Sequence, residues 1–337
     1  MEWVDFLENT VAAFAFVLGA LFGSFANVVI YRVPRGLSVV RPGSACPGCG
    51  TPIRWYQNIP ILSYLALRGR CATCKAPISI RYPLVELVCA VLALAVWQQA
   101  LLNPAAFELA DKLVLFTFHF FFMLGLVIII FVDLDTMMIP DVISLPGTAL
   151  GLLAALLLGD FTGVTWRDSL AGAGLGAGVI WLIRFFYRRF KGVEGMGLGD
   201  VKLMAMLGAF LGWKAVLFIL LAGSVQGMLY AVIIYLVGRG GDKGTTPVPQ
   251  HPDTPAPQAP LEAEVLPGTD PLTACAAGNG KQPAPLDPED AALAALAAQH
   301  PFRMMVIPFG PFLSLAGIQW FFFAGPIEAF LQALFTL

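Results

Sequence analysis

Long apolar stretches are the feature of this sequence that most constrains its fold. An α-helix needs ~20 apolar residues to cross a bilayer, and only helices and closed barrels satisfy every backbone polar group within lipid. Charged residues make up 12% of the chain, about half the ~25% of a soluble domain. The sequence therefore predicts an all-α polytopic membrane protein with about eight transmembrane helices. The apolar stretches are residues 10–31, 83–102, 113–132, 142–159, 168–190, 200–212, 214–237 and 306–335. The sixth stretch is short, and prolines interrupt the last one.

The charges of the loops predict the side of the membrane on which each loop lies. From Arg32 to Arg81 the chain carries eight Lys or Arg and no Asp or Glu. Short basic loops stay in the cytoplasm, and alternation of the spans then makes the loops near 133–141 and 184–202 cytoplasmic as well. The N-terminus has three acidic residues and no basic one, so we expect a retained helix and not a secretory signal.

Two aspartates, Asp133 and Asp200, lie at corresponding cytoplasmic ends of the third and sixth stretches. Ionisable residues within membrane segments are costly, and they mark functional sites. Asp133 could instead cap a loop or pair with Arg or Lys, and Asp200 could be a plain helix N-cap. Asp135 competes with Asp133 for the same role, while Asp141 is expected to cap the fourth stretch. Alternating glycines at 195, 197 and 199 precede Asp200 and allow a close approach of backbone.

Two carboxylates a few ångströms apart would share one proton, since both cannot ionise easily. The ionised member could then activate a water molecule, while the protonated member polarises a peptide carbonyl and assists the departing amine. The pair therefore predicts an aspartic protease without a covalent intermediate. A membrane transporter that binds cations through its acids is the alternative, although no inverted repeat supports it.

Four cysteines form a C-x2-C … C-x2-C pattern in the basic loop, at Cys46, Cys49, Cys71 and Cys74. Thiolates at this spacing suit a closed tetrahedral zinc site, which is structural because it leaves no open position. Two disulfides are the alternative, but a reducing cytosol disfavours them. We expect Cys89 and Cys275 to be inert.

Several motifs in this order resemble the bifunctional type IV prepilin peptidase family, also called prepilin leader peptidase/N-methyltransferase. The four cysteines accompany the motifs GSFANVVIYR at 23–32, NIPILSY at 58–64, IRYPLVE at 80–86, DLDTMMIPD at 133–141, GLGDVKL at 197–203 and IPFGPF at 307–312. The G-x-G-D motif alone is weak, whereas the ordered set is specific.

The resemblance implies a multi-pass enzyme of the bacterial inner membrane whose active site is near the cytoplasmic face. Such enzymes remove the leader of type IV prepilins or type II secretion pseudopilins after a glycine. They then methylate the new N-terminal residue with S-adenosylmethionine. The catalytic pair maps onto Asp133 and Asp200, and the metal ligands onto the four cysteines. The lipid bilayer is the other expected partner, and no nucleic acid is expected.

The S-adenosylmethionine site is the least defined prediction. We expect it beside the zinc loop, with Glu86 and Gly69 as candidate cofactor-binding residues. Alternating glycines at 172–178 lie in an apolar span, where they predict close helix packing and not a nucleotide-binding loop. A peptidase of the same type without methyltransferase activity therefore stays an alternative, as does a non-enzymatic zinc-containing scaffold.

These expectations divide the chain into five parts. A first transmembrane helix (1–31) precedes a cytoplasmic zinc-binding domain associated with methyl transfer (32–82) and a transmembrane peptidase core (83–238). A cytoplasmic linker follows at 239–301, where abundant proline predicts disorder. The final transmembrane segment is expected at 302–337.

Overall fold

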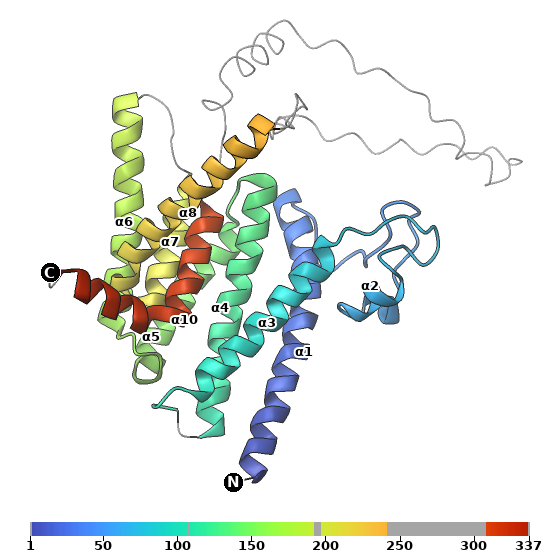
Figure 1. Ribbon diagram of the computed structural model, residues 1–337, viewed down its shortest axis with the longest axis horizontal. Helices are drawn as coiled ribbons and strands as arrows, with labels where there is room; N and C mark the ends of the chain where they lie inside the picture. Colours follow the sequence, from blue (N-terminus) through green and yellow to red (C-terminus); the bar gives the residue numbers. More distant parts are fainter. Residues whose placement is uncertain (1, 107, 192–196, 241–307, 336–337) are drawn as a thin grey trace, which may run out of the picture. The chain divides into compact units, whose positions relative to one another are not determined.

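The helices of the structure follow the apolar stretches of the sequence (Figure 1). The computed structural model describes residues 2–106, 108–191, 197–240 and 308–335, and no β-strand occurs among them. The predicted linker, apart from its first two residues, and the start of the final segment lie outside these residues. The helices that match the eight stretches are α1 (Glu2–Arg32), α3 (Arg81–Leu101), α4 (Leu109–Thr136), α5 (Asp141–Thr162), α6 (Trp166–Lys191), α7 (Leu198–Leu211), α8 (Trp213–Gly240) and α10 (Gly310–Phe335).

Seven of these helices are long and apolar enough to cross a membrane, and α7 is not among them. With 14 residues, α7 is about 21 Å long, which is less than the ~30 Å hydrocarbon thickness. The described part of the chain is therefore an all-α polytopic membrane protein, with α7 as a short helix packed among the longer ones. The eight expected stretches are thus confirmed as eight helices, of which seven are long and α7 is short.

Helix α4 has the largest number of buried residues among the described helices. Twelve of its residues are buried, and it packs against α1, α3, α5 and α10. The ring of Phe122 stacks on Phe210 of α7 with centroids 4.0 Å apart, while Phe120 meets Phe22 of α1 edge to face. All of these contacts lie within one compact unit, to which residues 2–230 and 308–335 belong. This packing fixes the position of the polar residues at the end of α4.

The glycines of α6 occupy two different environments. A Cβ added at Gly172 would collide with the backbone of α7, and one at Gly176 would lie 2.5 Å from the carbonyl oxygen of Met204. A Cβ at Gly174 or Gly178 would meet no atom within 4 Å. Alternate glycines thus allow α6 and α7 to approach closely, as the sequence predicted for a helix contact in a membrane.

We expect Gly172→Ala to lower the thermal stability of the purified protein and Gly174→Ala to leave it unchanged or slightly higher. The first substitution overpacks the contact between α6 and α7, at a cost of about 1–3 kcal/mol. The second places a methyl group in open space and improves helix propensity. Thermal unfolding of both variants in one detergent measures the difference, and equal melting temperatures would show that the close approach is not needed.

Candidate functional site

Asp133 and Asp200 come from different helices and interact with each other. Asp133 lies in the last turn of α4 and is 4% exposed, and Asp200 lies in the first turn of α7 and is 8% exposed. The two carboxylates are close enough for a direct electrostatic interaction. Two buried acids that repel each other favour a state in which one proton is shared between them.

Backbone N–H groups hold each carboxylate in place. The N–H of Gly197 donates to Oδ2 of Asp200 over 3.3 Å, and the N–H of Gly310 donates to the carboxyl group of Asp133. Gly197 is the N-cap of α7, and Gly310 is the first residue of α10. Asp200 is thus not the N-cap that the sequence left as an alternative; it occupies the third helical position, where the positive end of the helix favours a negative charge.

Ile139 packs between these helix ends. A Cβ added at Gly199 would lie 2.9 Å from the Cβ of Ile139, and a Cβ added at Gly310 would lie 3.0 Å from its Cδ1. The aspartates therefore lie where α4 ends and where α7 and α10 begin. Sequence reasoning did not assign roles to Ile139 or Gly310, although both belong to the motifs that carried the resemblance.

We expect Gly310→Ala to lower the turnover number for any reaction at the two aspartates by about 10²-fold, the effect of a displacement of about 1 Å. The added Cβ would lie 2.6 Å from Oδ2 of Asp133, so the carboxylate must move. Gly325→Ala on the same helix is the matched control, because a Cβ at Gly325 meets no atom within 4 Å. Equal turnover numbers for the two variants would contradict the role of Gly310.

Each of the neighbouring aspartates, Asp135 and Asp141, makes an ion pair with a basic residue. Oδ1 of Asp135 lies 2.7 Å from a guanidinium nitrogen of Arg81 at the start of α3. Asp141 lies 2.7 Å from Nζ of Lys202 in α7. The expectation that Asp141 caps its helix is wrong, because Pro140 is the N-cap of α5 and makes no side-chain cap. The carboxylate of Asp141 binds Lys202 and does not cap the helix.

The four cysteines of the basic loop form one cluster. Their sulfur atoms all lie within 4.8 Å of one another, and those of Cys46 and Cys74 are 3.8 Å apart. A tetrahedral site with metal–sulfur bonds of about 2.3 Å requires sulfurs about 3.8 Å apart. The cluster could therefore hold a metal ion.

The two cysteine pairs repeat the same backbone pattern. The residue after each pair, Gly50 or Lys75, has a positive φ and donates its N–H to the carbonyl of the first cysteine of that pair. Each first cysteine also donates to a carbonyl five residues later, at Thr51 or Ala76. This repeated turn directs both sulfurs of a pair to the same side, as a four-thiolate site requires.

Glu86 and Gly69, the candidate cofactor residues, have structural contacts. Oε2 of Glu86 accepts the backbone N–H of Ile61 over 2.8 Å, and the carboxylate also accepts from Ser24 of α1. Ile61 has a φ of +60°, so Glu86 holds a strained turn of the loop. A Cβ added at Gly69 would lie 2.9 Å from the hydroxyl of Tyr64. Their cofactor roles stay a prediction.

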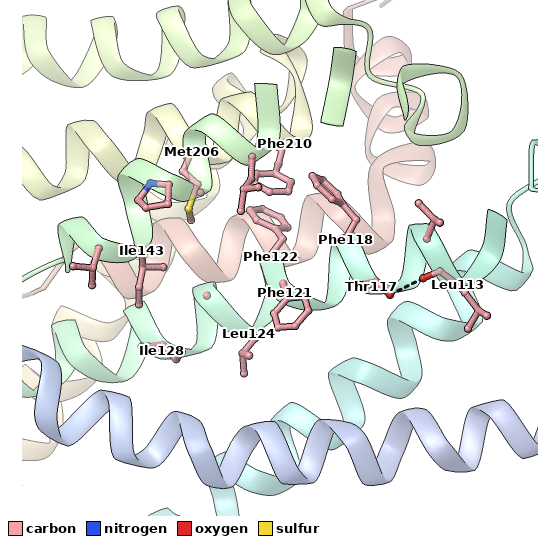
Figure 2. A pocket seen from close by; sticks show the side chains of 16 residues that line it. Leu113, Thr117, Phe118, Phe121, Phe122, Leu124, Ile128, Ile143, Met206 and Phe210 are labelled. Carbon is pink, nitrogen blue, oxygen red and sulfur yellow. Dashed lines mark hydrogen bonds between the residues drawn. The ribbon is translucent and has the colours of Figure 1, made fainter. Parts of the chain in front are cut away.

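An apolar cavity of about 660 Å³ lies between α4, α5 and α7 (Figure 2). Ile128, Ile143 and Met206 line one end, and the rings of Phe118, Phe122 and Phe210 lie farther along. Ile128 precedes Asp133 by five residues, and Met206 follows Asp200 by six, or about 8–9 Å along each helix. Apolar space thus extends to within two turns of both aspartates.

Comparisons with known proteins identify the family. The bacterial peptidase A24 N-terminal domain matches residues 17–100, and the type IV leader peptidase family matches residues 120–232. The prepilin leader peptidase/N-methyltransferase of Myxococcus xanthus is 39% identical over 91% of this chain and 89% of the relative. Proteins of that name from Pseudomonas putida (39%; 71% and 85% covered) and Pseudomonas aeruginosa (37%; 75% and 91%) are also similar. No solved structure matches. The chain belongs to the type IV leader peptidase family.

Proposed function

We propose that this protein is a membrane aspartic endopeptidase that removes the leader from type IV prepilins or pseudopilins and N-methylates the new N-terminus. S-adenosylmethionine is the proposed methyl donor. The observation that carries the peptidase activity is the pair of buried, interacting carboxylates of Asp133 and Asp200. The names of the relatives support both activities.

The chemistry follows from the shared proton. The ionised carboxylate takes a proton from a water molecule as the water oxygen attacks the scissile carbonyl carbon. The protonated carboxyl hydrogen bonds to the carbonyl oxygen, and the carboxyl pair passes the proton taken from water to the departing nitrogen when the C–N bond breaks. Asp133 and Asp200 act as one unit in this scheme, with Gly310 and Gly197 as positioning residues.

The cytoplasmic face is the proposed side for this reaction. Arg81 follows the basic loop and pairs with Asp135, which is two residues from Asp133 on α4. The basic loop and the two catalytic aspartates therefore lie at the same end of the helices. Since basic loops remain in the cytoplasm, this contact supports an active site near the cytoplasmic face of the inner membrane.

Zinc is the proposed metal of the four cysteines. Four sulfur ligands would complete its tetrahedral shell and leave no position for substrate. When bound by Cys46, Cys49, Cys71 and Cys74, zinc would supply folding energy to the loop that connects α1 and α3.

The test is incubation of the purified protein with a full-length prepilin, with and without S-adenosylmethionine, followed by intact-mass analysis. We expect loss of the leader in both reactions and a gain of one methyl group only with the donor. Leader loss without the methyl gain would restrict the protein to the peptidase activity. No change in either reaction would contradict the proposed function and favour the scaffold or transporter.

A further inference from the structure

The apolar cavity between α4, α5 and α7 extends along α4 from Ile128 to Leu113 (Figure 2). These residues are 15 positions apart, or about 22 Å along a helix, and they belong to a helix that is long and apolar enough to cross a membrane. Among the described residues that line the cavity, Thr117 has the only polar side chain. Its hydroxyl donates to the carbonyl of Leu113 on the same helix. The cavity therefore presents apolar surface to its occupant.

One end of the cavity approaches the proposed catalytic aspartates. Ile143 lines this end, and Ile139, four positions earlier, packs against the glycines at 199 and 310 beside the two carboxylates. The remaining distance of about 8–9 Å along α4 or α7 corresponds to two or three extended residues at ~3.3 Å each. A chain with its scissile bond at the aspartates can thus place the residues on one side of that bond in the cavity.

The position of the cavity along a membrane-spanning helix limits the form of a polypeptide that occupies it. Within lipid a chain must satisfy its own backbone N–H and C=O groups, so it is helical there. A helix 22 Å long and ~10 Å wide fills roughly 1,700 Å³, which is more than twice the cavity volume of about 660 Å³. The cavity therefore takes the side chains along one face of a helix, and the opposite face stays in lipid.

Two glycines give the cavity a wall that suits a helix. Gly125 of α4 and Gly147 of α5 both line it, and a Cβ added at Gly125 would already lie 3.3 Å from Cγ2 of Ile143. Lipid chains are as apolar as leucine, so helices associate in a membrane through close packing, which small residues at the contact permit. Farther along, the ring of Phe121 is 49% exposed and adds apolar surface. These features favour a helix over acyl chains.

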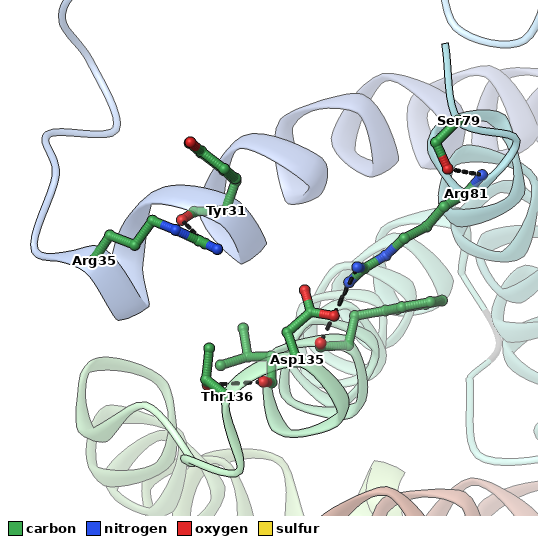
Figure 3. A network of polar contacts seen from close by, with 8 residues as sticks. Tyr31, Arg35, Ser79, Arg81, Asp135 and Thr136 are labelled. Carbon is green, nitrogen blue, oxygen red and sulfur yellow. Dashed lines mark hydrogen bonds and ion pairs between the residues drawn. The ribbon is translucent and has the colours of Figure 1, made fainter. Parts of the chain in front are cut away.

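A smaller cavity near the end of α4 does not suit an apolar helix (Figure 3). It holds about 180 Å³, and its lining includes Arg81 and Asp135, whose side chains form a 2.7 Å ion pair. Burying apolar side chains against these charged groups would cost the ion pair its remaining contact with water. Of the two cavities, the apolar one is therefore the one that fits a row of apolar side chains.

We propose that the apolar cavity is the site at which an apolar helix of the substrate docks, beside the peptide bond that the aspartates cut. The inference rests on the proposed peptidase activity and assigns residues of α4 and α5 to substrate selection. A substrate then needs apolar side chains three or four positions apart on one helix face, within a few residues of the scissile bond. Lining residues far from the aspartates act on substrate affinity and not on bond cleavage.

The first experiment fills the cavity at its far end. Thr117→Trp adds a large ring there, 16 positions or about 24 Å along α4 from Asp133. We expect the KM for cleavage of a full-length prepilin to rise about tenfold, a typical penalty for overpacking one contact, while kcat stays unchanged. Leu156→Trp is the matched control, because Leu156 of α5 is 65% exposed and lies outside the lining.

The second experiment identifies the occupant without filling the cavity. Phe121 is replaced by the photoreactive p-benzoylphenylalanine in the full chain, which is reconstituted in nanodiscs with the prepilin and irradiated. We expect crosslinks to the apolar segment of the prepilin from position 121, whereas the same probe at position 156 should crosslink to lipid only. Mass spectrometry of the digested products identifies the partner. This readout applies even if Thr117→Trp does not fold.

The outcomes separate this inference from the proposed function. A tenfold rise in KM at unchanged kcat and prepilin crosslinks from position 121 support the docking site. Crosslinks from position 121 to lipid only, in a sample that cleaves prepilin, would overturn the inference and make the cavity an acyl-chain site. A folded Thr117→Trp variant with the KM of the unmodified protein would overturn it as well. Absence of cleavage by the unmodified protein would contradict the proposed function itself, and the inference with it.

Discussion

Replacing either Asp133 or Asp200 with Asn is expected to lower the turnover number for prepilin cleavage by about 10⁴-fold, at the upper end of what one proton-transfer group contributes. Each substitution keeps the side-chain volume but removes one member of the proton-sharing pair. The change should appear in kcat, because in the proposed mechanism the carboxylates act on the reacting atoms. Single-turnover cleavage of a prepilin in detergent measures it.

The double variant and a neighbouring residue provide the controls. Because the two carboxylates act as one unit, the Asp133→Asn and Asp200→Asn double variant should be no slower than either single variant. Asp135→Asn should keep cleavage, since Asp135 pairs with Arg81. A larger cleavage defect in Asp135→Asn than in Asp133→Asn would show that the wrong member of the DLD motif was assigned.

The second large effect is expected at the cysteine cluster. Cys46→Ser and Cys71→Ser should each lose bound zinc, because one missing thiolate opens a closed four-sulfur site. Structural zinc contributes about 10–16 kcal/mol of binding free energy in small zinc domains, so the loop should lose its fold. Metal analysis of the purified protein gives the zinc content, and limited proteolysis within residues 36–80 reports the loss of structure.

Cys89→Ala is the control for this experiment. Cys89 is buried in α3, outside the cluster, so its removal should leave the zinc content at one ion per chain. Full zinc occupancy in both serine variants would refute the four-thiolate assignment. Removal of the metal with a chelator from the unmodified protein should reproduce the proteolysis pattern of the serine variants.

The sequence predicted the features that depend on local pattern. The long apolar stretches predicted the helices, because a membrane segment must form the hydrogen bonds of its own backbone N–H and C=O groups. The C-x2-C spacing predicted the cysteine cluster, and the two repeated turns of that cluster involve only residues close in sequence. The alternating glycines of α6 predicted close packing, and Gly172 and Gly176 confirm it, whereas Gly174 and Gly178 meet open space.

The features that the sequence did not predict depend on contacts between distant residues. Lys202 pairs with Asp141 across 61 positions, which removes the capping role that the local motif suggested. The hydrogen bond from Gly310 to Asp133 joins α10 to α4, and no local pattern reveals such a partner. The sequence showed that the sixth stretch is short, but not that α7 packs against α5, α6 and α10.

The contact between Gly310 and Asp133 has a consequence for biosynthesis. Ribosomes build the chain from its N-terminus, so both aspartates enter the membrane more than one hundred residues before Gly310 is made. Until α10 arrives, the Asp133 carboxylate lacks the N–H donor that positions it. A nascent or prematurely terminated polypeptide that ends before Gly310 would therefore have an incompletely positioned aspartate pair, and under the proposed mechanism proteolytic competence would be acquired only as the last helix inserts.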